Sequence, residues 1–324
     1  MSHCHIEFYM VMKKGVKISL IVIAVILAIL AGFVWFLRPK KSIPEVSTGT
    51  LERYPDFESE YIAKRNVSIW LPDNYSNRDS CMVLYMHDGQ MLFDADATWN
   101  HKEWSVDEVL GQMTAAGELP PCIVVAIDNT KDRLNEYFPQ KVSEFVPEEV
   151  RAKNNMDPKG DAYLQFVVHE LKPFVDAHYR TYTDQEHTFI AGSSMGGLIS
   201  LYALCEYPEV FCGAVCMSSH LSMAYLPMGK QNEAWAEGFQ KYLMDRLPSQ
   251  EGHRVYMDHG TKLLDADYGP YQACVDSIFQ AKGWDDNHYL SLVYEDHTHD
   301  EICWGLRLKP SLEFVVPHLS KVGF

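Results

Sequence analysis

Positive charge is scarce in this chain. Its 324 residues include 28 lysines and arginines against 44 aspartates and glutamates, which gives a formal net charge of −16. Six of the basic residues and only one acidic residue fall within the first 41 positions, so the remainder has 22 basic and 43 acidic residues and a net charge of −21. An excess of negative charge of this size repels phosphate groups, and it argues against nucleic acid or an anionic surface as a partner.

Recognisable metal-binding spacings are also missing. The eight cysteines form no tight framework, and Cys212 and Cys216 stand four apart in an apolar run, which is typical of buried cysteines. The strongest metal alternative is the group His297, His299 and Asp300, but the pattern His-x-His-x-Asp-His is not completed and no His-Glu-x-x-His occurs. We therefore expect no metal and no cofactor.

One long apolar run occurs, from Ile18 to Leu37, and its length matches a helix that spans a bilayer. Trp35 near its end suits an interfacial anchor. The sequence predicts a short N-terminal tail at 1–17, a transmembrane helix or signal anchor at 18–37 and a linker at 38–46. A cleaved signal peptide is the alternative, but the run is longer than a usual signal-peptide core and no small-x-small cleavage site follows it.

Lysines and arginines flank the run equally, so charge does not fix its orientation. A short tail before a large domain favours export of that domain. We expect a membrane-anchored protein whose catalytic domain lies outside the cytoplasm, on the periplasmic or extracellular side. Secretion after signal cleavage is the alternative.

The rest of the chain alternates buried strands with helical patterns. Residues 42–58 are interpreted as a polar linker, and the alternation over 61–71 predicts a half-buried strand. Continuous apolar runs predict buried strands at 81–87, 122–127 and 210–219, and further strands are expected at 254–258 and 288–294. A capping box at Ser105 predicts a helix start, and a long polar insertion occupies 128–160. This order predicts an α/β fold with a mostly parallel central sheet flanked by helices.

A Gly-x-Ser-x-Gly motif lies at the centre of this pattern. Gly192 and Gly196 flank Ser194 between the apolar run at 189–191 and a helical pattern that starts near Leu198. In a strand–turn–helix of this kind the serine occupies a strained corner, and the small flanking residues let the strand and the helix approach closely. Ser194 is therefore the candidate nucleophile.

An acid and a histidine should follow this serine along the chain. Both Asp258, at a strand end, and Asp265, in the loop beyond it, are candidate acids, and we prefer Asp265 because the loop can reach an imidazole. His299, which directly precedes the last helix, is the candidate base.

Backbone amides complete the expected site. Met195 follows the nucleophile at a helix start, and Gln90 lies in the glycine turn after the strand at 81–87, so their amides are the candidate oxyanion donors. In the polar insertion, Arg133, Glu136 and Tyr137 are candidate residues of the substrate rim.

Six stretches together resemble the esterase family of α/β-hydrolases that includes esterase D, enterochelin esterases and feruloyl esterase modules. They are 84–94, 125–129, 136–137, 192–197, 258–261 and 299–304, and the resemblance covers about residues 47–324. It implies an α/β-hydrolase fold with a triad of Ser194, an acid in the loop 260–265, and His299. In several members the acid stands closer to the glycine, at a position that is Leu263 here.

The expected function is that of a serine hydrolase, which cleaves a carboxylic ester through an acyl-enzyme. The substrate would be a small-molecule or glycan-linked ester. An acyltransferase with the same triad is the alternative, and a catalytically idle binding module is a further one. The sequence does not determine the oligomeric state.

Overall fold

The computed structural model describes residues 21–23, 25–27, 43–152, 157–223 and 233–316. The predicted tail, most of the apolar run at 18–37, the first part of the linker and residues 317–324 lie outside this part of the chain. Within the described residues, no helix combines the length and the apolar character that crossing a membrane requires. The predicted transmembrane helix thus stays a prediction from the sequence.

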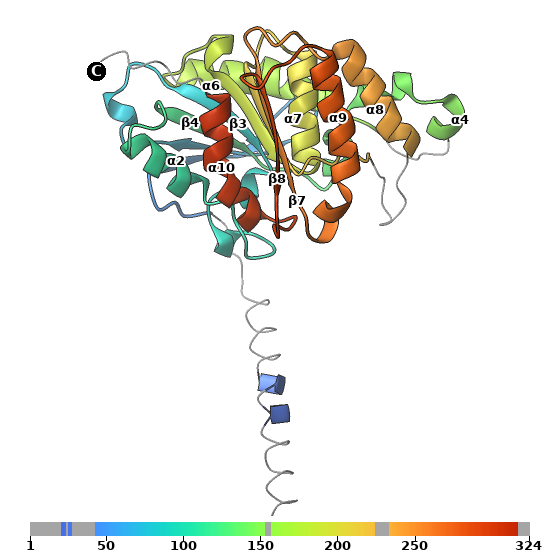
Figure 1. Cartoon of the computed structure of the whole chain (residues 1–324). Coiled ribbons are helices and arrows are strands. Elements are labelled where there is room, and N and C mark those ends of the chain that lie inside the picture. Colours follow the sequence, from blue (N-terminus) through green and yellow to red (C-terminus); the bar gives the residue numbers. More distant parts are fainter. Residues whose placement is uncertain (1–20, 24, 28–42, 153–156, 224–232, 317–324) are drawn as a thin grey trace, which may run out of the picture.

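An eight-stranded sheet forms the centre of the domain (Figure 1). The strand order is β1-β2-β4-β3-β5-β6-β7-β8, and the pairs from β4 to β8 are parallel, whereas β1 and β2 are antiparallel to their neighbours. The strands are β1 (Thr50–Phe57), β2 (Arg65–Leu71), β3 (Met82–His87), β4 (Cys122–Ile127), β5 (Thr188–Ser193), β6 (Gly213–Met217), β7 (Arg254–Gly260) and β8 (Tyr289–Tyr294).

Helices cover both faces of this sheet. The longer ones are α2 (Val106–Ala115), α6 (Lys172–His178), α7 (Met195–Glu206), α8 (Glu233–Arg246), α9 (Gly269–Ala281) and α10 (Glu301–Val315). Apolar residues of α2 and α10 pack on one face, and those of α7, α8 and α9 pack on the other. Every residue of β3 and β4 is buried, as the continuous apolar runs predict for strands covered on both sides.

The remaining short helices belong to the connections. They are η1 (Tyr75–Asn77), η2 (Gly89–Met91), η3 (Ala95–Ala97), α3 (Arg133–Glu136), η4 (Gln140–Phe145), α4 (Glu148–Arg151), α5 (Gly160–Gln165), η5 (Phe166–Leu171), η6 (Gln185–His187) and η7 (Leu263–Asp267). Thus α3, η4 and α4 give structure to the polar insertion at 128–160. Because the carboxyl ends of the parallel strands share one edge of the sheet, η2, α3, η7 and the start of α10 all belong to that edge.

Two local predictions are wrong. The polar stretch 42–58 contains β1. This strand forms because its backbone pairs with β2, and the sequence of the stretch gives no sign of that pairing. Ser105 does not cap α2 through its side chain, because it adopts a left-handed conformation with φ of 53°. The Val106 amide instead donates to the carbonyl of Leu92, so tertiary contacts determine how this helix starts.

Candidate active site

Ser194 occupies the sharp corner between β5 and α7. Its backbone has φ of 57° and ψ of −121°, a strained conformation for a residue with a side chain. The Ser194 carbonyl accepts hydrogen bonds from the amides of Leu198 and His220, both at 3.1 Å, which hold the corner in place. A Cβ atom on Gly192 would lie 2.7 Å from the carbonyl carbon of Gly196, so the close approach of strand and helix requires glycine there.

The candidate oxyanion donors lie at helix starts. Met195 is the first residue of α7, so its amide has no acceptor within the helix. Gln90 lies in η2, directly after β3, and its side-chain oxygen accepts from the Asn129 amide at 3.0 Å. A Cβ atom on Gly89 would lie 2.6 Å from the backbone of Ala126, so this turn presses closely against β4.

Asp88 fixes the turn that carries Gln90. Its carboxylate accepts from Arg133 Nε at 2.6 Å, from Arg133 Nη2 at 2.7 Å and from the Asn129 amide group at 2.5 Å. Burial alone would raise the pKa of Asp88, but the charge and hydrogen bonds of Arg133 outweigh burial and lower that pKa. Asp88 is therefore ionised at neutral pH and ties the turn after β3 to α3.

Asp265 and His299 face each other across the same edge. His299 Nδ1 lies 2.5 Å from Asp265 Oδ1. The other oxygen of this carboxylate, Oδ2, accepts from Ser218 Oγ at 2.6 Å and from the Gly260 amide at 2.7 Å. Burial acts to raise the pKa of Asp265, but the hydrogen bond and charge of His299, together with these two donors, lower it. The ionised carboxylate accepts the Nδ1 proton and leaves the imidazole Nε2 as an acceptor.

Asp258, the other candidate acid, is buried and has different partners. Its carboxylate pairs with Arg307 at 3.1 Å and accepts from the Tyr256 hydroxyl at 3.0 Å and from the Ser218 amide at 3.2 Å. Burial raises the pKa of Asp258 to about 6, although Arg307 acts to lower it. The geometry therefore brings Asp265, and not Asp258, against His299.

Two residues that the sequence did not single out complete this arrangement. The Tyr268 hydroxyl lies 2.8 Å from His220 Nδ1, and the His220 amide donates to the Ser194 carbonyl. The Tyr268 ring also meets the His299 ring edge to face, with centroids 5.6 Å apart. Tyr268 thus lies beside His299 and is linked through His220 to the Ser194 corner. Its position three residues after Asp265 is the only signal in the sequence.

Ser218 is the second residue that sequence reasoning missed. It follows β6 with φ of 40° and is fully buried. Its hydroxyl donates to Asp265 and accepts from Trp304 Nε1 at 3.1 Å and from Arg307 Nη2 at 3.0 Å. Ser218 therefore links the Asp258–Arg307 ion pair to the carboxylate beside His299.

The three candidate rim residues differ in exposure. Arg133 stays partly exposed, and its guanidinium lies 5.0 Å from the centroid of the Tyr137 ring. Glu136 is buried in a bidentate pair with Arg65, at 2.9 and 3.0 Å, and Tyr137 is buried with its hydroxyl 3.2 Å from the Asp88 amide. Glu136 and Tyr137 are therefore interior residues that hold neighbouring elements in place. Of the three, Arg133 is the residue that reaches the surface.

The metal alternative gains no support from the described residues, among which no group of three histidine, cysteine, aspartate or glutamate side chains is arranged to hold an ion. Asp300 instead caps α10 through the Cys303 amide at 3.0 Å and pairs with Lys102 at 2.8 Å. Cys212 and Cys216 are buried free cysteines, as expected.

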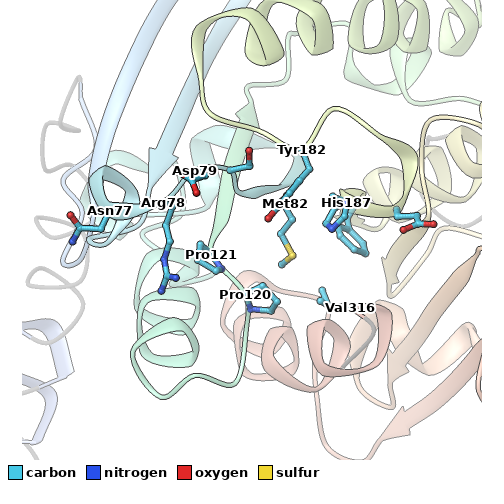
Figure 2. Close-up of a pocket in the computed structure, with 12 residues that line it drawn as sticks. Asn77, Arg78, Asp79, Met82, Pro120, Pro121, Tyr182, His187 and Val316 are labelled. Carbon is cyan, nitrogen blue, oxygen red and sulfur yellow. The ribbon is translucent and has the colours of Figure 1, made fainter. Parts of the chain in front are cut away.

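A pocket of about 390 Å³ lies at the opposite edge of the sheet (Figure 2). Its lining includes Met82 at the start of β3, Pro121 before β4 and Phe189 near the start of β5. None of the candidate catalytic residues lines it. This cavity is therefore separate from the edge that carries Ser194.

Comparison with known proteins identifies the family. A family model described as "Putative esterase" matches residues 59–302, about three quarters of the chain. The chain belongs to this esterase family. Among curated proteins, this esterase-family chain is 26% identical over 187 residues to the uncharacterized protein YjcH of Bacillus subtilis, covering 57% of this chain and 68% of that protein.

Solved structures share the fold of this family member. A ferulic acid esterase superposes with a TM-score of 0.61 at 21% identity, covering 84% of this chain and 99% of the other. An enterobactin esterase from Shigella flexneri gives a TM-score of 0.59 at 21% identity, covering 86% of this chain and 62% of the other. These matches establish the α/β-hydrolase-like fold, and the family establishes the relation to esterases.

Proposed function

We propose that this chain hydrolyses a carboxylic ester, with Ser194 as nucleophile, His299 as general base and Asp265 as the acid that orients His299. The observation that carries the proposal is the position of the Asp265–His299 pair at the same edge as the strained Ser194 corner. The esterase family and the fold of the related esterases support the same chemistry.

The reaction begins with proton transfer from Ser194. For this transfer the Ser194 hydroxyl must point toward His299 Nε2, the ring nitrogen on the side away from Asp265. Such contacts commonly tighten only when substrate is bound. As Ser194 Oγ bonds to the ester carbon, His299 takes the proton and Asp265 stabilises the imidazolium.

The carbonyl oxygen becomes an oxyanion in this step. The Met195 and Gln90 amides are the proposed donors to it, and the positive end of the α7 dipole favours the developing charge. His299 then protonates the departing alcohol, which leaves an acyl group on Ser194. A water molecule, deprotonated by His299, releases the acid and restores the serine.

We also propose that the substrate is a small-molecule or glycan-linked ester and that Arg133 contributes to its rim. The apolar run at 18–37 is proposed to anchor the chain in a membrane, with the domain on the outer side. These proposals rest on the sequence, and the partly exposed guanidinium of Arg133 supports the rim assignment.

The experiment compares Ser194→Ala with Ser193→Ala on a panel of chromogenic, feruloyl and siderophore esters. Ser194→Ala is expected to abolish hydrolysis in a folded protein, since it removes the nucleophile and leaves the glycines unchanged. Ser193 is a buried residue at the end of β5, and its replacement is the matched control, with a much milder effect. Equal activity of Ser194→Ala and wild type would refute the proposal, and added alcohols would reveal acyl transfer as competing ester formation.

A further inference from the structure

Several exposed apolar side chains belong to the connections at the edge of the sheet that carries the proposed triad. Leu263 is 77% exposed, Leu306 68% and Trp99 62%. The full group follows the carboxyl ends of β3, β4, β7 and β8 and consists of Trp99, Leu134, Leu263, Leu264, Ile302 and Leu306, which we call the apolar edge. In Figure 1 the teal connection after β3 and the starts of α9 and α10 lie together on the lower side of the domain.

Part of the apolar edge is a firmly held groove. A cavity of about 460 Å³ lies between residues 95–105 and α10, and Ile302 and Leu306 line it one helical turn apart. The two walls are joined by Lys102 with Asp300 at 2.8 Å and by Asn100 with Glu301 at 2.9 Å. Because these contacts join the two walls, the exposed side chains of Ile302 and Leu306 are held in fixed positions. Exposed apolar side chains along a groove of this kind mark an interaction site.

The chain enters the domain beside the apolar edge. The Glu45 amide donates to Asp94 at 2.9 Å and the Ser47 hydroxyl donates to Asp107 at 3.0 Å. Asp94 belongs to the same connection after β3 as Trp99. Only residues 38–42 separate the apolar run from Ile43, where the described domain begins, and so few residues reach at most about 20 Å.

From these observations we propose that the apolar edge docks on the surface of the bilayer in which residues 18–37 are anchored. The proposal deepens the proposed function, on which it rests, because it directs the active site toward esters presented at a lipid surface. Apolar side chains, and not positive charge, provide the contact, so a zwitterionic surface suffices and the net negative charge of the domain is no obstacle.

The test uses the full chain in phosphatidylcholine vesicles. Nitroxide labels are attached to Trp99→Cys, to Leu306→Cys and, as the matched control, to Tyr182→Cys, after the reactive native cysteines have been replaced by serine. Tyr182 is also exposed but lines the pocket at the opposite edge (Figure 2). At 99 and 306 we expect oxygen, which concentrates in lipid, to reach the label better than a water-soluble nickel chelate does, and the reverse at 182.

Three results would overturn docking on lipid. One is equal accessibility at all three positions, and another is contact that appears only with anionic lipid. The third is spin–spin broadening at 99 and 306, which indicates that a second copy of the chain covers the apolar edge. Because label accessibility is measured without catalysis, it tests docking on lipid independently of whether the chain hydrolyses esters.

A kinetic measurement adds a second, independent check. Because the two substitutions remove large apolar side chains from the proposed lipid contact, the double variant Trp99→Glu, Leu306→Glu should hydrolyse an ester embedded in vesicles at least about tenfold more slowly. Hydrolysis of a short water-soluble ester should be unchanged, since neither residue belongs to the proposed triad or oxyanion hole. Equal loss on both substrates would contradict the docking role, and no hydrolysis of either by wild type would refute the proposed function instead.

Discussion

The assignment of the acid can be tested by exchanging one atom. In Asp265→Asn, one carboxylate oxygen becomes an amide group of nearly the same size. Ser218 Oγ and the Gly260 amide donate to Asp265 Oδ2 at 2.6 and 2.7 Å, so the remaining oxygen of the asparagine has to stay on their side. The new amide group is then forced to face His299 Nδ1, where Oδ1 lies 2.5 Å away in the wild type.

This orientation determines the size of the effect. An amide that donates to Nδ1 selects the imidazole tautomer with its proton on Nε2. A protonated Nε2 cannot accept the proton of Ser194. The same exchange in a serine protease lowers turnover about 10⁴-fold, and we expect a similar loss here, equivalent to about 5.5 kcal/mol of transition-state stabilisation. Substrate binding should change little, so the loss should appear in kcat and leave KM nearly constant.

The matched control is Asp258→Asn. This change removes the charge that Arg307 pairs with at 3.1 Å in the interior, so it should destabilise the fold by about 3–5 kcal/mol. Turnover of the folded fraction should fall much less than in Asp265→Asn. Initial rates and thermal melts of both variants decide the matter. A fully active Asp265→Asn beside a folded but inactive Asp258→Asn would refute the assignment and move the acid to the end of β7.

Three further predictions concern Tyr268, Glu103 and the Glu136–Arg65 pair. Tyr268→Phe removes the hydroxyl that lies 2.8 Å from His220 Nδ1 but keeps the ring that meets the His299 ring, so kcat should change by less than about fivefold, the equivalent of one hydrogen bond; a fall of more than tenfold would instead make the hydroxyl a catalytic donor. Burial and neighbouring carboxylates raise the pKa of Glu103 from 4.5 to about 7, so the folded chain retains a proton that the unfolded chain releases, and stability falls as pH rises through this interval. Glu103→Gln should flatten that fall in urea titrations at pH 5 and 8, and an unchanged pH dependence would contradict it. Glu136→Gln leaves the buried Arg65 without its counter-charge and should lower unfolding free energy by about 3 kcal/mol, whereas a loss below 1 kcal/mol would show that the pair is dispensable.

The sequence by itself determined the features that depend on neighbouring residues. The continuous apolar run at 122–127 predicts β4, because a strand covered on both faces needs apolar side chains in every position. The corner at Ser194 was equally predictable, since glycines at 192 and 196 allow the close approach that the structure shows. The family resemblance rested on such local stretches, and the family match agrees with it.

The tertiary structure alone decided which distant side chains meet. His299 contacts Asp265 across 34 positions of the chain, and Ser218 contacts Asp265 across 47 and Arg307 across 89. These contacts depend on how β6, β7 and β8 pair, because the register of the strands sets which loop ends lie opposite one another. Asp258 and Asp265 flank one glycine turn and are the same residue type. The position of Asp265 in the loop favoured it as the acid, but only the fold decides that Asp258 meets Arg307 and Asp265 meets His299.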